Sequence, residues 1–148
     1  MFKRPFITAL TIMSFLFSAT TLTAAADIQV SIGGLRSTDG VVLVAVFDRE
    51  EVFLDSGEQI VTLSLNAGTA KAGIVTGAVK NLPAGQYAVV VHHDENDNNY
   101  FDTNFFGLPA EGYGFSNDVE VFLSKPAFEE AAFKLGAQDV SVAIRMTY

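Results

Sequence analysis

Apolar and polar residues alternate along much of this chain, in the pattern of strands that bury one face. The alternation is clear in residues 27–32, 61–66 and 140–148. Residues 41–47 instead form an almost continuous apolar run after an Asp39-Gly40 turn signal, which indicates a strand in the middle of a sheet. These segments favour strands over helices.

Further β-rich segments fill the remaining chain. Residues 73–80 and 87–93 read as strands, 119–123 is another candidate, and 128–135 is either a strand or a short helix. The sequence therefore predicts a single all-β domain, an antiparallel β-sandwich of seven to eight strands. It carries one long loop rich in Asp and Asn, from Asp94 to about Asp118. A loop of this length usually has a function or a special means of stabilisation.

The start of this loop has the oxygen spacing of an EF-hand-like calcium loop. With Asp94 at position one, side-chain oxygens fall at position three (Asn96), five (Asn98) and nine (Asp102), and position seven (Tyr100) offers its backbone carbonyl. The spacing predicts a weak calcium site. The alternative is a solvated loop in which these side chains bond their own backbone.

Two other positions of the loop bear on this hypothesis. Position six needs a residue that tolerates a positive φ, and Asn99 does. Position twelve should hold a bidentate Glu but holds Phe105, so another acid has to complete the calcium shell. Glu111 is the first candidate and Asp118 the second.

The N-terminus reads as a secretory signal peptide over residues 1–26. Lys3 and Arg4 precede an apolar stretch at 6–17, and three alanines at 24–26 form the cleavage pattern. A membrane anchor is the alternative, although the stretch is shorter than the roughly 20 residues of a spanning helix. We therefore expect a domain of residues 27–148 in the periplasm or outside the cell, with no membrane insertion of the mature chain.

Composition narrows the classes of partner. The chain has no cysteine, so no disulfide or lipidated cysteine is available. Its net charge of −8 falls to −10 when Lys3 and Arg4 are removed, which argues against nucleic acid as a partner. A protein and a carbohydrate both remain possible as the ligand.

The two histidines are adjacent and would point to opposite faces of a strand. His93 could act as a general base with Asp94, Asp97 or Glu111 around a metal-bound water. The simpler interpretation has His93 bonded to loop carbonyls. We assign no catalytic residue.

The predicted loop contains five large apolar residues: Phe105, Phe106, Leu108, Tyr113 and Phe115. They predict either a lid folded over the open end of the sandwich or a stacking platform for a sugar or peptide. The lid is the favoured expectation, because apolar side chains gain free energy when they are buried.

Several motifs resemble a bacterial exported family known as domain of unknown function 2141. The block from His93-Asp94-Glu95-Asn96 to Gly114-Phe115-Ser116-Asn117 carries the similarity, together with 82–88 and Pro126-Ala127-Phe128. The chain departs from that family's pattern at Asp97 and Asn99, where Gly is usual. The resemblance implies a sandwich similar to transthyretin-like and peptidase-regulatory-like modules, and it implies no activity.

The expected function is an exported, non-enzymatic β-sandwich module with a calcium-organised loop and a binding face at the loop end. A small metal-assisted hydrolase that uses His93 and loop carboxylates is the first alternative. A structural component of the cell envelope is the second.

Overall fold

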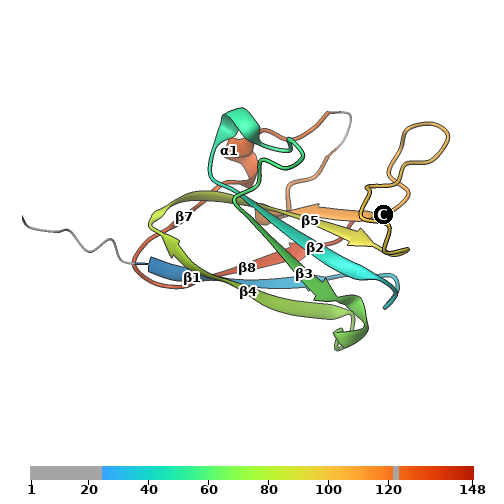
Figure 1. The fold of residues 1–148 in the computed structure, drawn as a ribbon, viewed down its shortest axis with the longest axis horizontal. Coiled ribbons are helices and arrows are strands. Elements are labelled where there is room, and N and C mark those ends of the chain that lie inside the picture. The colour runs from blue at the N-terminus through green and yellow to red at the C-terminus, as the bar shows by residue number, and fades with distance from the viewer. Residues whose placement is uncertain (1–24, 122–123) are drawn as a thin grey trace, which may run out of the picture.

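A computed structural model describes residues 25–121 and 124–148, which form two stacked layers of strands (Figure 1). Most of the predicted signal peptide lies outside the described residues. Its last two residues begin the first strand, where Ala26 is buried.

The first sheet has three strands in the order β4 (Ile74–Pro83), β1 (Ala25–Gly33) and β8 (Val140–Arg145). β1 pairs with β4 antiparallel and with β8 parallel. The antiparallel expectation therefore does not hold for the β1–β8 pair. These two strands come from opposite ends of the domain, so no short connection forces them to run in opposite directions.

The second sheet has the order β3 (Val61–Asn66), β2 (Val41–Phe47), β5 (Gly85–Asp94) and β6 (Gly112–Phe115), all antiparallel. A short fifth strand, β7 (Phe133–Leu135), pairs with the start of β5. The apolar run predicted to be a central strand is indeed β2, which lies between β3 and β5.

The core lies between the two sheets and consists mainly of branched aliphatic side chains. Alternate residues of β1 and β2 are buried, among them Ile28, Ile32, Val42 and Val44, each without exposed surface. The all-β class is thus confirmed, with eight strands in the described part of the chain, although the two sheets stay separate and do not close into one.

Within residues 25–121 and 124–148, helical structure is confined to single turns. These are η1 (Glu50–Val52), η2 (Ala67–Thr69), η3 (Ser116–Asp118) and α1 (Phe128–Ala131). The segment predicted as strand or helix is therefore both, since α1 leads directly into β7. No helix in the described parts of the chain is long and apolar enough to cross a membrane.

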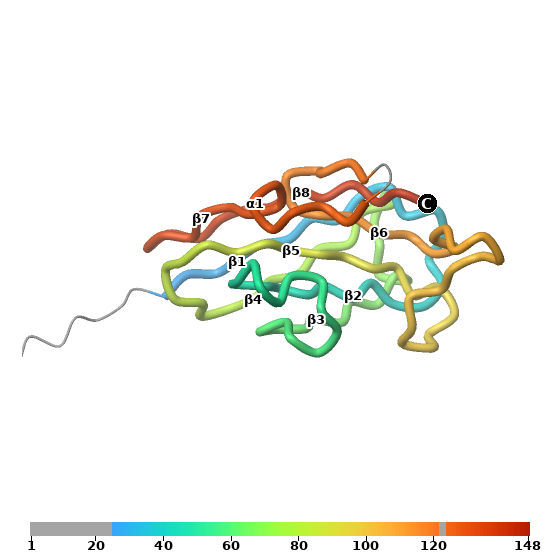
Figure 2. Tube along the Cα trace, turned by 90° about the horizontal axis from the view of Figure 1, so that it is seen from above, coloured from blue at the N-terminus to red at the C-terminus, as the bar shows by residue number. Residues whose placement is uncertain are grey.

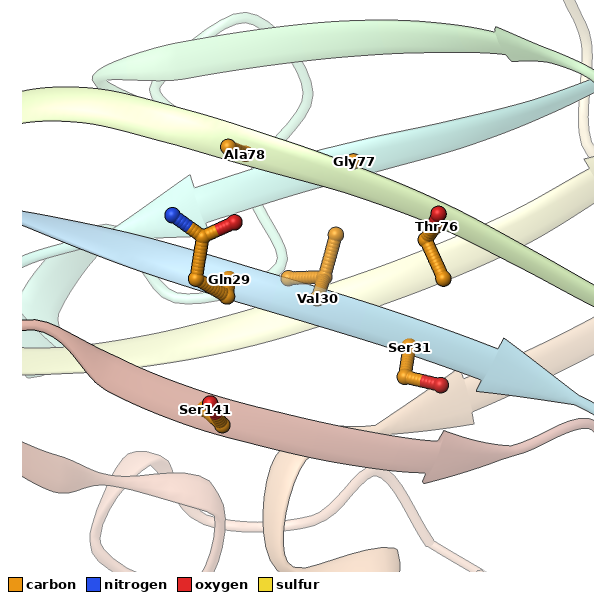
Figure 3. A pocket seen from close by; sticks show the side chains of 7 residues that line it. All are labelled: Gln29, Val30, Ser31, Thr76, Gly77, Ala78 and Ser141. Carbon is orange, nitrogen blue, oxygen red and sulfur yellow. The ribbon is translucent and has the colours of Figure 1, made fainter.

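The outer face of the three-stranded sheet carries a patch of mostly short, uncharged side chains. Figure 3 shows Gln29, Ser31, Thr76 and Ser141 around a shallow depression of about 420 Å³. It has no charged group in its lining and lies on the sheet that does not carry the acidic loop.

The sequence did not predict β6, which lies inside the segment expected to be loop. The glycines of β6 allow the backbone of another segment to lie very close, and they do not form turns. A Cβ on Gly114 would lie 2.7 Å from the carbonyl oxygen of Arg145. Backbone bonds of 2.9 and 2.8 Å between Tyr113 and Thr147 then join β6 to the residues that follow β8. The true loop is residues 95–111, shorter than predicted.

Candidate functional site: the loop end of the sandwich

The loop of residues 95–111 connects β5 to β6 and projects from one end of the sandwich, beside the C-terminus (Figures 1 and 2). The turn that contains Gly40 packs against the start of this loop, at Asp94 and Glu95. A Cβ on Gly40 would lie 1.9 Å from the carbonyl oxygen of Asp94, and its φ is +63°. Only glycine fits there.

Asp94 closes the first part of the loop. Its carboxylate has no exposed surface and accepts hydrogen bonds from the backbone N–H of Asn98 (3.1 Å) and of Asn99 (2.7 Å). Asn99 has a φ of +64°, the backbone conformation predicted for position six. A buried carboxylate with two donors stabilises this turn without help from solvent.

Three of the predicted ligand side chains meet at one point. The amide nitrogens of Asn96 and Asn98 both donate to Oδ2 of Asp102, at 2.7 and 2.9 Å. Their amide oxygens accept from the backbone N–H two residues further on, at 3.0 Å from Asn98 and 2.7 Å from Tyr100. The Asp- and Asn-rich start of the loop therefore consists of Asx turns, in which the side-chain oxygens of Asn96 and Asn98 accept from the loop's own backbone. Their amide nitrogens donate to Asp102.

Glu111 fastens the base of the loop. Its Oε1 accepts from the N–H of Glu95 (3.1 Å), and its Oε2 accepts from the N–H of Asp102 (3.1 Å) and from Nε2 of His92 (2.8 Å). The residue is 4% exposed. One buried carboxylate thus joins both arms of the loop to β5.

The predicted calcium ligands fit the ion only in part. No three carboxylate or imidazole groups within residues 25–121 and 124–148 lie close enough together to hold a metal. Both oxygens of Glu111 are engaged with donors, and Asp118 accepts from the N–H of Arg145 instead. Calcium would require Asn96 and Asn98 to turn their oxygens toward Asp102.

His93 is fully buried and both of its ring nitrogens are bonded. Nε2 lies 2.9 Å from the carbonyl oxygen of Asp39, which can only accept, so this nitrogen carries the proton in the neutral ring. Nδ1 then accepts from the hydroxyl of Tyr148 at 2.7 Å. His93 joins the loop end to the C-terminus, and its carbonyl partner lies in the turn before β2 and not in the acidic loop.

Arg36 covers the outside of this cluster. Its guanidinium pairs with Glu95, donates to the carbonyl oxygen of Ala110 (2.9 Å) and lies 4.3 Å from the ring centre of Tyr148. Hydrogen bonding to Arg36 lowers the pKa of the Glu95 carboxyl below its usual value. Burial raises the pKa of Tyr148.

The aromatic tip of the loop does not form the expected lid. Phe105 is 96% exposed, Phe106 83% and Leu108 60%. The prediction of a lid is wrong for these residues, because the turn that carries them points away from the sheets (Figure 1). Tyr113 and Phe115 instead belong to β6, where Phe115 is buried.

An apolar groove of about 660 Å³ lies beside the loop. Aromatic side chains line part of it in edge-to-face contacts, with ring centres 5.1 Å apart for His92 and Phe101 and 6.0 Å apart for Tyr113 and Phe115. Leu54 and Leu108 add to its wall. The groove is large enough for a small ligand or for side chains of another protein.

Several site residues were not predicted from the sequence. His92 pairs with Glu111, whereas the prediction had considered His93 with that acid, and Arg36 and Tyr148 were not considered at all. The period-two pattern did place the two histidines on opposite faces of the strand, and the structure pairs His92 with Glu111 and buries His93. Arg36 and Tyr148 are 112 residues apart, so no local pattern indicates their contact.

A family model described as "Uncharacterized protein conserved in bacteria (DUF2141)" matches residues 30–143. The match covers most of the domain and includes the whole loop of residues 95–111. The comparison with curated proteins and the comparison with solved structures found no match. The chain belongs to the DUF2141 family of bacterial proteins.

Proposed function

We propose that this chain is an exported, non-enzymatic β-sandwich module whose loop end is a binding face. The observation that carries the proposal is the exposure of Phe105 and Phe106 at the tip of a loop held firmly at its base. Exposed apolar residues grouped on one face mark interaction sites in soluble proteins. Aromatic anchors on a preorganised loop lose little conformational entropy on binding.

The chemistry of the two histidines supports a module without catalysis. His93 has no exposed surface and no unbonded ring nitrogen. His92 donates to Glu111, which also accepts two backbone N–H groups, so this carboxylate is engaged in holding the loop. The hydrolase alternative would need to release one of these groups before any proton transfer.

Calcium is the cation that we propose for the loop, at a site around Asp94, Asn96, Asn98 and Asp102. The closeness of the Asn96 and Asn98 side chains to Asp102 and the conformation of Asn99 support it, and binding would turn the two amides so that their oxygens replace the N–H donors. Since the loop already bonds itself, we expect a weak Kd of about 10⁻⁴–10⁻³ M. Tenfold excess of calcium over Kd would then add about 1.4 kcal/mol to the free energy of unfolding.

A calcium titration followed by thermal melting tests this part of the proposal. The Tm should rise by roughly 5 °C at tenfold excess of calcium over Kd, and Asp102→Asn should weaken the response. Asp97→Asn is the matched control, because it removes one charge from the same loop at a position that is not a ligand. Equal responses in all three proteins would contradict the calcium site.

The binding face is tested with peptide and oligosaccharide arrays. Wild-type protein should bind a subset of the array, and the double variant Phe105→Ser/Phe106→Ser should lose it. Ile60→Ser/Ile74→Ser removes two exposed isoleucines elsewhere, 40% and 44% exposed, and should bind like wild type. Unchanged binding by the Phe variant would rule out this face.

A further inference from the structure

The edges of the two sheets are protected to very different degrees. An exposed edge strand presents N–H and C=O groups that can pair with another chain, and proteins usually block such edges. Where β6 and β8 meet, Tyr113 and Thr147 exchange backbone bonds of 2.9 and 2.8 Å, and the N–H of Arg145 donates to Asp118 (2.8 Å). β7 is only three residues long. These edges are bonded or short.

The other two outermost strands are β3 and β4, which pair on one side only, with β2 and β1. The edge of β4 is irregular, because its register with β1 shifts between Ala26 and Ile28 and Asn81 has a φ of +59°. The strand also carries an exposed Lys80 and ends at Pro83. A bulge, a lysine and a proline are the means by which natural sheets prevent pairing at an edge. β4 is therefore a poor template for another strand.

β3 has none of these features. Residues 61–66 pair with β2 in one continuous register and include no proline, glycine or charged residue. The neutral stretch extends over residues 59–70, although the chain as a whole has a net charge of −8. Alternate side chains of β3 are exposed on the outer face. β3 is thus a regular, uncharged edge.

The backbone groups that point outward from β3 belong to Thr62, Ser64 and Asn66. The ladder between β2 and β3 continues in a 3.2 Å bond from the N–H of Ala67 to the carbonyl of Gly40. Because antiparallel strands bond through alternate residues, the odd-numbered residues of β3 face β2 in the same way. The even-numbered residues face away from β2. No strand lies on that side within residues 25–121 and 124–148, so these groups can bond another strand.

We propose that β3 is a dimerisation edge, at which two copies pair their β3 strands antiparallel about a two-fold axis through Ser64. In this register Ser64 lies opposite itself and Thr62 lies opposite Asn66 of the other copy. Each outward N–H then meets an outward carbonyl, and the second sheets of the two copies become one continuous sheet. The contact goes beyond the loop-end binding face and does not involve the loop tip.

The backbone of Asn66 can take part in this ladder. Its carbonyl already accepts from Oγ1 of Thr69 (2.7 Å), but a carbonyl oxygen has a second lone pair for the N–H of Thr62 of the other copy. A two-fold axis through Ser64 is also the register that matches all three outward residues at once. An axis through Thr62 or Asn66 would pair fewer residues of β3.

The side chains of β3 favour a second copy as the partner strand. On the exposed face, Thr62 would lie beside Asn66 and Ser64 beside Ser64, which are polar pairs without like charges. On the core face, Leu63 would lie beside Leu65 of the other copy. Both leucines are partly buried against the core, so a neighbouring strand would cover surface that is still exposed. The edge is therefore complementary to itself on both faces.

Sedimentation velocity over a range of concentrations tests the dimer, with protein purified after expression of the full chain. Wild type should dimerise, and Ser64→Lys should raise the dimer Kd at least about 10-fold, because the axis places the two ammonium groups side by side. Ser141→Lys is the matched control, since it makes the same change at an exposed position of β8. A wild-type chain that stays monomeric, or a dimer that ignores Ser64→Lys, would overturn the proposal.

A mixing experiment tests whether residue 64 meets itself. Ser64→Lys and Ser64→Glu should each associate weakly, since like charges then face each other across the axis. An equimolar mixture should form a heterodimer with a Kd below that of either variant alone. Thermal melting of the separate variants checks that each is folded. Two folded variants that do not associate better together than apart would contradict the axis through Ser64.

Disulfide trapping tests the register, because the chain has no cysteine of its own. Residues opposite one another in a bonded antiparallel pair have Cα atoms about 5.5 Å apart, within the range that a disulfide spans. Ser64→Cys should therefore cross-link with itself under mild oxidation. Thr62→Cys should not, because the two copies of residue 62 would lie about 13 Å apart along the strands. A mixture of Thr62→Cys and Asn66→Cys should cross-link. Cross-linking of Thr62→Cys with itself at the rate of Ser64→Cys would overturn this register.

The dimer and the loop-end binding face can fail separately. Phe105→Ser/Phe106→Ser changes the loop tip alone and should dimerise like wild type. If that variant became monomeric, the contact would lie at the tip and the assignment to β3 would be wrong. Loss of array binding in the same variant, with the dimer intact, would support both assignments.

Discussion

The interior of the sandwich and its loop end are stabilised by different physical means. Between the sheets, aliphatic side chains such as Ile28, Ile32 and Val44 are fully buried and contact one another. At the loop end, the buried groups include His93, Asp94 and Glu111, which are held by hydrogen bonds. One region relies on removing apolar area from water, and the other on satisfying polar groups.

This difference predicts how each region responds to substitution. Apolar burial is non-directional and spreads over many contacts, so its loss scales with the volume removed. The polar cluster is directional, and each missing partner leaves a specific group unpaired. In the described parts of the chain every buried side-chain polar atom has a hydrogen-bond partner. Removing one of these partners at the loop end therefore leaves a buried polar group unpaired.

The largest effect is expected for Ile32→Ala, which opens a cavity in the core beside the end of β1. Ile32 has no exposed surface, and such substitutions destabilise by about 2–5 kcal/mol. Chemical denaturation measures the change. Ile74→Ala is the control, since Ile74 lies in the neighbouring strand with 44% of its surface exposed. Similar losses for both would mean that the core does not dominate stability.

The strands of the interior could be predicted because their burial follows period two in the sequence. Residues 28–32 and 140–146 alternate between buried and exposed as their composition indicates. β6 could not be predicted, because Gly112 and Gly114 have no side chain to show a pattern and are required by contacts with residues near the C-terminus. The parallel pairing of β1 with β8 has no local signal either.

A smaller and more local effect is expected for Glu111→Gln. The amide keeps the shape of the side chain but replaces one accepting oxygen with a donor, which leaves an N–H of the loop unpaired at a cost of about 1–3 kcal/mol. Amide hydrogen exchange should accelerate at Glu95 and Asp102, whose N–H groups bond to Glu111, while β2 stays protected. Glu120→Gln makes the same charge change on the surface. Uniform acceleration across the protein would contradict a local role.

The chemistry of the loop was partly predictable for a related reason. Self-bonding of Asp94, Asn96 and Asn98 depends on neighbours two to five residues away, so spacing alone indicates it. The contacts that anchor the loop are long-range: Glu111 returns to His92, and Tyr148 reaches His93 from the end of the chain. Such contacts depend on strand register, which the sequence does not specify by itself.

Tyr148→Phe tests the connection between the loop end and the C-terminus. Removing the hydroxyl leaves Nδ1 of the buried His93 without its donor, so we expect a loss of about 1–2 kcal/mol. Tyr100→Phe is the same chemical change at a side chain that is 74% exposed and should be neutral. Thermal melting of the two variants decides the point. Equal Tm values would mean that the His93–Tyr148 bond contributes nothing to stability.

The smallest effect is expected for the Arg36–Glu95 pair on the surface of the same cluster. A double-mutant cycle with Arg36→Gln and Glu95→Gln should give only a small coupling energy, because water screens the pair. Arg36 also donates to the carbonyl of Ala110 and lies over the ring of Tyr148, so its single variant should lose more than that of Glu95. The coupling should shrink further in 1 M salt, where screening acts over about 3 Å. A coupling that is large and independent of salt would show that this ion pair behaves as part of the buried polar cluster. The boundary between the two modes of stabilisation would then lie further out, at the surface of the loop end.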